Sequence, residues 1–185
     1  MRPGGVCYTW RDAHILEGDN NYEILDGDLL PTSLPDVYHR RVADNLRLDL
    51  RRQINRLDWG KVYRHPYCIV LNKTTLVSPD LFLLHKSRLG IIQGRKALGA
   101  PEIVIEIDSE KSREEDLMTR RRLYARHGVR EYWLLSPLTH RVEVLIWSEV
   151  GYIKINSQVA SERIFSPLLP MLHISLAKIF SNCIP

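Results

Sequence analysis

Two acidic residues stand inside stretches that otherwise have the composition of buried β-strands. Asp80 begins the apolar run in SPDLFLL (78–84), and Glu106 lies within GAPEIVIEIDS (99–109). Because side chains alternate along a strand, Glu106 shares a face with Val104, while the isoleucines on either side of it point the other way. A carboxylate in such a place costs several kcal/mol unless it is paired, protonated or bound to a cation. Any chemistry of this chain should therefore be sought first at these two acids.

A divalent cation is one partner that would satisfy both carboxylates. If the two strands are neighbours, Asp80 and Glu106 can converge on one ion, and hard oxygen ligands suit Mg²⁺, which keeps waters and accepts phosphate oxygens. Such an ion polarises a phosphodiester and lowers the pKa of an attacking water, which is the chemistry of a nuclease. Two structural explanations remain open. Glu106 can form a buried ion pair with an arginine, and Asp80 can be a turn residue after Pro79.

The segment before these strands predicts a hairpin followed by a long amphipathic helix. Asp26-Gly27, within NYEILDGDLLPTS (21–33), suits the positive φ angles of a tight turn. Ser33 and Asp36 resemble a capping box, and apolar residues then recur at helical spacing to about Leu57. Six arginines, at positions 40, 41, 47, 51, 52 and 56, make the polar face of this helix basic. Such a face is usually only solvated, and contact with phosphates is the less common alternative.

The rest of the chain predicts a mixed α/β domain. Strands are expected at 61–71, 76–84, 103–107, 130–136, 141–148 and 151–157. A second helix is expected from the capping box of Ser112 and Glu115 to His127, where Gly128 ends it, and a short helix at 175–180. We therefore predict a single domain, residues 1–185, in which one central mixed sheet has a helix on either side.

Composition narrows the class of protein without identifying a function. Hydrophobic residues make up 44% of the chain and charged residues 26%, as in an ordinary globular domain. The net charge of +4 and the pI near 9.0 permit a polyanionic partner but do not require one. No apolar run approaches the roughly 20 residues of a membrane span, and the N-terminus lacks the pattern of a signal peptide. We therefore expect no membrane partner and a cytoplasmic location.

Several stretches together resemble a known family. SPDLFLL, GAPEIVIEIDS and DLMTRRRLYARHGVREYWLLSP (116–137), in this order and spacing, resemble the large bacterial family of putative restriction endonucleases within the PD-(D/E)xK nuclease superfamily. YEILDGDLL near the N-terminus and SPLLPMLHISLAKIF near the C-terminus resemble that family's beginning and end. The resemblance implies a restriction-endonuclease-like α/β fold, a central mixed β-sheet flanked by α-helices with an N-terminal β-hairpin, and a metal-dependent phosphodiesterase site.

The resemblance also implies roles for individual residues. Asp80 corresponds to the aspartate of the PD element and Glu106 to the acid of the (D/E)xK element, so both would bind Mg²⁺, with Mn²⁺ as an alternative. Glu23 corresponds to the family's N-terminal acid and His39 to its first-helix histidine, and both would lie near the site. Without the resemblance, Glu23 would be interpreted as an exposed hairpin residue and His39 as a helix-surface histidine.

The lysine of the (D/E)xK element is missing from this sequence. Asp108 occupies its position, and Arg120 occupies the position on the following helix where this family commonly has a lysine, between Asp116 and Tyr124. A guanidinium stays charged and cannot act as a base, but it can hold a phosphate. The spacing from Tyr124 puts Arg120 on the inward side of the helix, although a surface pair with Asp116 is an alternative. Lys111 is a second candidate for the missing cation.

The function that this resemblance implies is a Mg²⁺-dependent endonuclease acting on DNA, as a homodimer. Its site would consist of Asp80, Glu106, Arg120, Glu23 and His39. The missing lysine leaves two alternatives open: a degenerate family member that binds nucleic acid without cleaving it, and a domain that kept the fold for a structural or protein-binding purpose.

Overall fold

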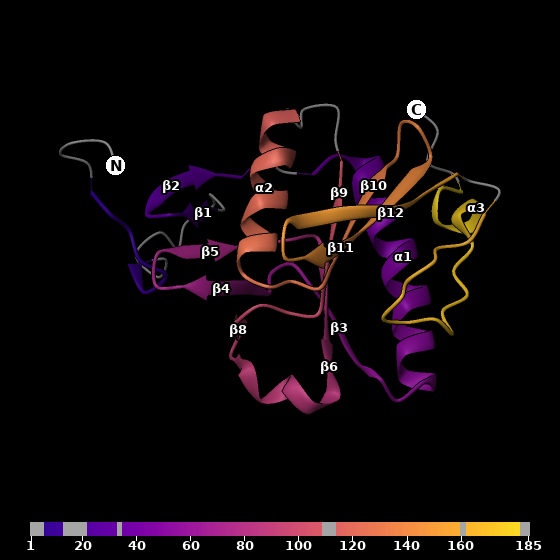
Figure 1. Cartoon of the computed structure of the whole chain (residues 1–185), viewed down its shortest axis with the longest axis horizontal. Coiled ribbons are helices and arrows are strands. Elements are labelled where there is room, and N and C mark those ends of the chain that lie inside the picture. The colour runs from indigo at the N-terminus through magenta and orange to yellow at the C-terminus, as the bar shows by residue number, and fades with distance from the viewer. Residues whose placement is uncertain (1–5, 13–21, 33–34, 109–113, 160–161, 182–185) are drawn as a thin grey trace.

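The computed structural model of the chain contains two six-stranded sheets (Figure 1). It describes residues 6–12, 22–32, 35–108, 114–159 and 162–181. The central sheet has the strand order β12-β11-β10-β9-β6-β3, and the second sheet has the order β2-β1-β5-β4-β8-β7. None of the helices in these ranges is both long and apolar enough to cross a membrane.

The central sheet is mixed, as the sequence predicts. Its strands are β3 (Gly60–Arg64), β6 (Leu81–His85), β9 (Ile103–Ile107), β10 (Glu131–Ser136), β11 (Arg141–Ser148) and β12 (Gly151–Val159). Only β9 and β10 pair in parallel, and the other neighbours in this sheet are antiparallel. A parallel pair needs a crossover connection, and the connection here contains the helix α2 (Glu114–Arg126). All five residues of β9 are buried, because the strand is in the middle of the sheet and covered on both faces.

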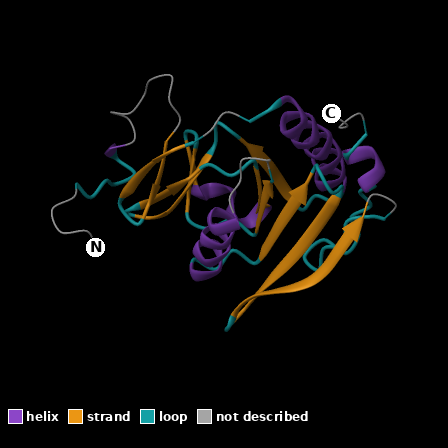
Figure 2. Cartoon of the chain, turned by 90° about the horizontal axis from the view of Figure 1, so that it is seen from above, coloured by secondary structure: helices purple, strands orange, loops and turns teal. Residues whose placement is uncertain are grey.

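Two helices cover the opposite faces of the central sheet (Figure 2). The helix α1 (Val37–Arg56) packs its apolar side against the face that carries Ile103, Ile105 and Ile107. The other face, which carries Val104, packs against α2. This arrangement confirms the prediction of a helix on either side of a central sheet. A short helix, α3 (Leu176–Ile179), lies near the C-terminal end of the described chain and contacts α1.

The second sheet was not predicted. It consists of β1 (Tyr22–Leu25), β2 (Asp28–Pro31), β4 (Cys68–Asn72), β5 (Thr75–Val77), β7 (Ile92–Gln93) and β8 (Lys96–Leu98). The turn between β1 and β2 is the predicted one, with positive φ at Asp26 and Gly27. The 3-10 helix Lys86–Ile91 and the strands β7 and β8 occupy a region expected to be a loop.

Two predicted strands are in fact four, which corrects the prediction of a single sheet. The predicted strand 61–71 divides into β3 and β4 around Pro66, and 76–84 divides into β5 and β6 around Pro79. Proline has no N–H to give to a strand ladder, so each chain segment leaves one sheet and joins the other at that point. Consequently β3 and β6 lie in the central sheet, whereas β4 and β5 lie in the second.

The helix boundaries agree approximately with the predicted ones. The N-cap of α1 is Asp36, whose carboxylate accepts a hydrogen bond from the backbone N–H of His39 at 2.8 Å, in place of the predicted capping box. Ser33, the other member of that predicted box, lies outside the described residues, as do Ser112 and the side chain of Glu115. The helix α2 ends just before Gly128, which has a φ of 76° and stops the helix as predicted.

Candidate active site

The strand register places Asp80 opposite Glu106. Strands β6 and β9 pair antiparallel with Leu81 aligned with Ile105, and Asp80 is the residue just before β6. Extending this register by one residue puts the two acids on neighbouring strands and on the same face of the sheet, where directly opposed side chains are in reach of one another. This face is the one that α2 covers. The charge of Asp80 raises the pKa of Glu106, so the two carboxylates lie near enough to affect one another.

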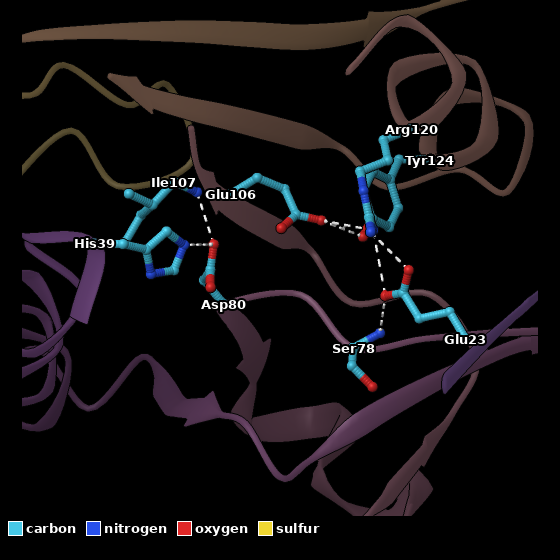
Figure 3. A network of polar contacts seen from close by, with 8 residues as sticks. All are labelled: Glu23, His39, Ser78, Asp80, Glu106, Ile107, Arg120 and Tyr124. Atoms are coloured by element: carbon cyan, nitrogen blue, oxygen red, sulfur yellow. Dashed lines mark hydrogen bonds and ion pairs between the residues drawn. The ribbon is translucent and has the colours of Figure 1, made fainter. Parts of the chain in front are cut away.

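Asp80 is held by two hydrogen bonds that arrive from different elements (Figure 3). Its Oδ2 accepts one from the backbone N–H of Ile107 at 2.8 Å, and it lies 3.1 Å from Nε2 of His39. His39 is in the first turn of α1 and is buried. It is therefore not a helix-surface histidine, which is how the residue would be interpreted without the family resemblance. Burial lowers the pKa of His39, but the hydrogen bond to Asp80 and the negative charges of Asp80, Asp36 and Glu106 outweigh it, so the pKa is raised. His39 thus ties the first turn of α1 to Asp80.

Glu106 is held from the other side, by α2. Its Oε1 accepts a hydrogen bond from the hydroxyl of Tyr124 at 2.7 Å and one from Nη1 of Arg120 at 3.3 Å. Burial raises the pKa of Glu106 to about 7; the charge of Arg120 and the Tyr124 hydroxyl oppose that rise, whereas the charges of Asp80 and Glu23 add to it. The side chain is only 11% exposed. Burial therefore makes the ionised form of Glu106 harder to reach than that of an exposed glutamate, and Arg120 partly offsets this cost.

Arg120 joins Glu106 to a third carboxylate, that of Glu23 on β1 (Figure 3). Its Nη2 lies 2.6 Å from Oε2 of Glu23, and its Nη1 lies 3.3 Å from Oε1 of both Glu23 and Glu106. The backbone N–H of Ser78 donates to Oε1 of Glu23 at 2.7 Å. Glu23 is 2% exposed, so it is a buried partner of Arg120 and not an exposed hairpin residue. The two acidic neighbours raise the pKa of Arg120 although burial acts against them, which keeps the guanidinium charged.

The remaining carboxylate oxygens at this site fit a divalent cation by their chemistry. Within the described part of the chain, no hydrogen bond is assigned to Oδ1 of Asp80 or to Oε2 of Glu106. Carboxylate oxygens with room for water are the ligands that Mg²⁺ and Mn²⁺ accept. A cluster of three or more acidic, histidine or cysteine side chains arranged for a metal does not occur among the residues described. The protein would thus supply two carboxylates, and water or substrate would supply the other ligands.

The five residues proposed from the sequence form two hydrogen-bonded groups. The structure adds the hydroxyl of Tyr124 and the backbone N–H groups of Ser78 and Ile107 to them. His39 and Asp80 form one group, and Glu106, Arg120 and Glu23 form the other. The hydroxyl of Tyr124 was not assigned a role, although its position four residues after Arg120 places it on the same side of α2. The backbone N–H of Ser78 could not have been found, since a main-chain donor leaves no signal in residue types.

The structure decides between the two predicted positions of Arg120, which are facing the site and pairing with Asp116 on the helix surface. Arg120 pairs with Glu23 and Glu106, whereas Asp116 is exposed, so the surface pair between Arg120 and Asp116 is not the arrangement found. Asp108, at the lysine position itself, has a buried Oδ1 without a hydrogen-bond partner in the described chain. Lys111 lies outside the described residues.

Comparisons with known proteins agree with this fold. The model of the Uma2 family, described as "Putative restriction endonuclease", matches residues 10–177. The chain is also similar to the crystal structure of a putative nuclease belonging to DUF820 from Anabaena variabilis ATCC 29413, with 17% sequence identity and a TM-score of 0.79. That likeness covers 96% of this chain and 99% of the other, and it confirms the predicted restriction-endonuclease-like fold. No curated protein matches the chain.

Proposed function

The chain belongs to the Uma2 family of putative restriction endonucleases, and from this premise we propose that it is a Mg²⁺-dependent endonuclease that hydrolyses phosphodiester bonds in DNA. The site would be of the PD-(D/E)xK type, with Asp80 and Glu106 as metal ligands and with Arg120, Glu23 and His39 around them. The observation that carries the proposal is the position of Asp80 opposite Glu106 in the register of β6 and β9. Among the described residues, each of the two has one carboxylate oxygen to which no hydrogen bond is assigned.

A bound Mg²⁺ ion would supply the Lewis acidity that phosphodiester hydrolysis requires. The protein's own contribution is to hold the ligands in place. The bonds from Ile107 and His39 fix the carboxylate of Asp80 through its Oδ2. The bonds from Tyr124 and Arg120 likewise occupy Oε1 of Glu106. Each acid is therefore oriented before a cation arrives, which limits the reorganisation that binding requires.

Arg120 serves the site as a fixed positive charge. A guanidinium with a raised pKa does not give up a proton, so it cannot replace the family's lysine as a base. Its side chain is 24% exposed, so it is not fully enclosed by the protein. In that position it would stabilise negative charge that develops on a phosphate during hydrolysis.

The test is a plasmid-nicking assay with Mg²⁺ or Mn²⁺. We expect the wild type to nick and the double variant Asp80→Asn, Glu106→Gln to lose at least about 100-fold in rate, since it loses both anionic ligands. The matched control is Asp116→Asn, which removes an exposed carboxylate from α2 and should nick at the wild-type rate. Equal nicking by the wild type and the double variant would eliminate the proposal.

A second candidate function is DNA binding without cleavage. It is favoured by one observation: the cation at the lysine position is already shared between two carboxylates, Glu23 and Glu106. Under this alternative the purified protein binds DNA in a salt-dependent way and nicks none of it with either metal.

We also propose that the protein acts as a homodimer, so that two sites address two strands. Light scattering after size-exclusion chromatography would test this, and a monomer at working concentration would contradict it.

A further inference from the structure

The exposed side of α1 carries an excess of positive charge. Arg40, Arg47 and Arg51 lie within about 40° of one another around the helix, because 11 residues make almost three full turns. Arg64, at the end of β3, joins them: its Nη1 lies 2.9 Å from Oδ1 of Asp44, which also pairs with Arg47 at 3.5 Å. We call these four arginines the α1 basic surface. Asp44 and the N-cap Asp36, four residues before Arg40, stand against these four arginines, which leaves an excess of two positive charges.

This charge is accessible. Arg40 and Arg51 are exposed, and neither has an ion pair within the described ranges of the chain. The side chain of Arg64 is 56% exposed. The α1 basic surface lies beside β3, which is an edge strand of the central sheet. The C-terminal segment covers a different side of α1, where Asn45 donates to the carbonyl of Ile179 and Gln53 bonds His173.

The α1 basic surface begins at the candidate active site. Arg40 follows His39, whose ring contacts Asp80 at 3.1 Å (Figure 3). Arg64 pairs in register with Leu81, which is the residue after Asp80. The backbones of two separate elements thus place Arg40 next to His39 in sequence and Arg64 beside Leu81 in register, at the same end of the sheet as Asp80. From there the helix continues to Arg51, about 16 Å further along its axis at 1.5 Å per residue.

We infer that the α1 basic surface binds the phosphate backbone of double-stranded DNA on one side of the cleavage point. The inference rests on the proposed function, and it names the protein surface that holds the substrate. A stretch of about 16 Å corresponds to about five base pairs at 3.4 Å per step, so the contact extends past the scissile phosphate in one direction. Arginines on a helix that contact only phosphates position a duplex without reading its sequence.

The test measures binding of a 20-base-pair duplex by fluorescence anisotropy, in EDTA, over a range of NaCl concentrations. The variant is Arg40→Gln, Arg51→Gln, Arg64→Gln. Each lost phosphate contact should lower the slope of log Kd against log salt by about 1, so the slope should fall by about 3. Affinity at 0.15 M salt should fall on the order of 100-fold.

The matched control removes the same charge from other elements: Arg95→Gln, Arg130→Gln, Arg163→Gln, which are all exposed arginines outside α1. The inference is supported if only the α1 variant changes the slope. Equal effects of the two variants, no effect of either, or a wild type that does not bind the duplex would each overturn it. Nicking is measured separately. If DNA binding depends on these arginines but the wild type does not nick, the inference about the α1 basic surface holds and the proposed nuclease function fails. If the α1 variant binds and nicks DNA like the wild type, the nuclease function holds and the inference fails.

Discussion

Two buried glutamates on the neighbouring strands β9 and β10 differ in how their charge is compensated. Glu131, on β10, is 1% exposed, and its carboxylate accepts three hydrogen bonds: from the indole of Trp133 at 2.9 Å, the hydroxyl of Ser166 at 2.7 Å and the backbone N–H of Leu168 at 2.6 Å. All three donors are neutral. Glu106, on β9, is paired with a charged guanidinium and faces a second acid on the next strand.

This difference separates a structural acid from a candidate functional one. Two of the donors to Glu131 come from residues 166 and 168, so the bonds attach the C-terminal segment to the sheet, and both of its oxygens are occupied. Among the described residues, no hydrogen bond is assigned to Oε2 of Glu106, and burial and its acidic neighbours raise the pKa of this residue to about 7. A buried carboxylate therefore indicates a functional site when its partners are ionisable and one of its oxygens remains available to a ligand.

Removing the charged partner should give the largest change in stability. Arg120→Met leaves the buried carboxylates of Glu23 and Glu106 without their cation, and we expect a loss of about 3–5 kcal/mol in the free energy of unfolding. Urea denaturation at pH 7.5 measures it. The control is Arg122→Met on the exposed side of α2, which should change stability by less than about 0.5 kcal/mol. A loss as small as that of the control would show that Arg120 does not compensate these acids.

Removing Glu131 should have a somewhat smaller effect, of a different kind. Glu131→Ala leaves three buried donors unsatisfied, which should cost about 2–3 kcal/mol of unfolding free energy. Because the residue lies outside the site network, nicking per folded molecule should stay at the wild-type rate. Loss of activity in a variant that remains folded at the assay temperature would contradict the distinction between Glu131 as a structural acid and Glu106 as a site residue.

The smallest expected effect concerns pH. The pKa of Glu106 in the folded protein is raised from its ordinary value of 4.5 to about 7, so its contribution to stability is fully present below pH 4.5 and is lost as the pH rises through 7. Metal affinity should change with pH in the opposite direction, because a cation needs the ionised carboxylate. The affinity for Mn²⁺ should therefore rise with pH up to about 7. Calorimetric titration with Mn²⁺ from pH 5.5 to 8 measures the second effect. Affinity that is constant across this range would contradict the assignment of Glu106 as a ligand.

Much of the candidate site could be predicted from residue types and order. Asp80 and Glu106 are visible because a charge inside an apolar strand needs a partner, and Arg120 because its helical spacing faces inward. The second sheet could not be predicted in the same way. Short strands such as β5, β7 and β8 have two or three residues, which is too few to establish a period, and their pairing depends on segments far away in the chain.

The sequence by itself determined the central strand, the two covering helices and the acids Asp80 and Glu106, since these follow from periodicity and from the cost of burying charge. Glu23 and His39 followed only from the family resemblance. Only the tertiary structure decided how the acids are compensated. The alignment of β6 with β9 sets Asp80 opposite Glu106, and the packing of β1 near α2 brings Glu23 to Arg120 across 97 residues of chain. Such contacts depend on the register between strands and on the approach of distant elements, and neither is encoded in local residue patterns.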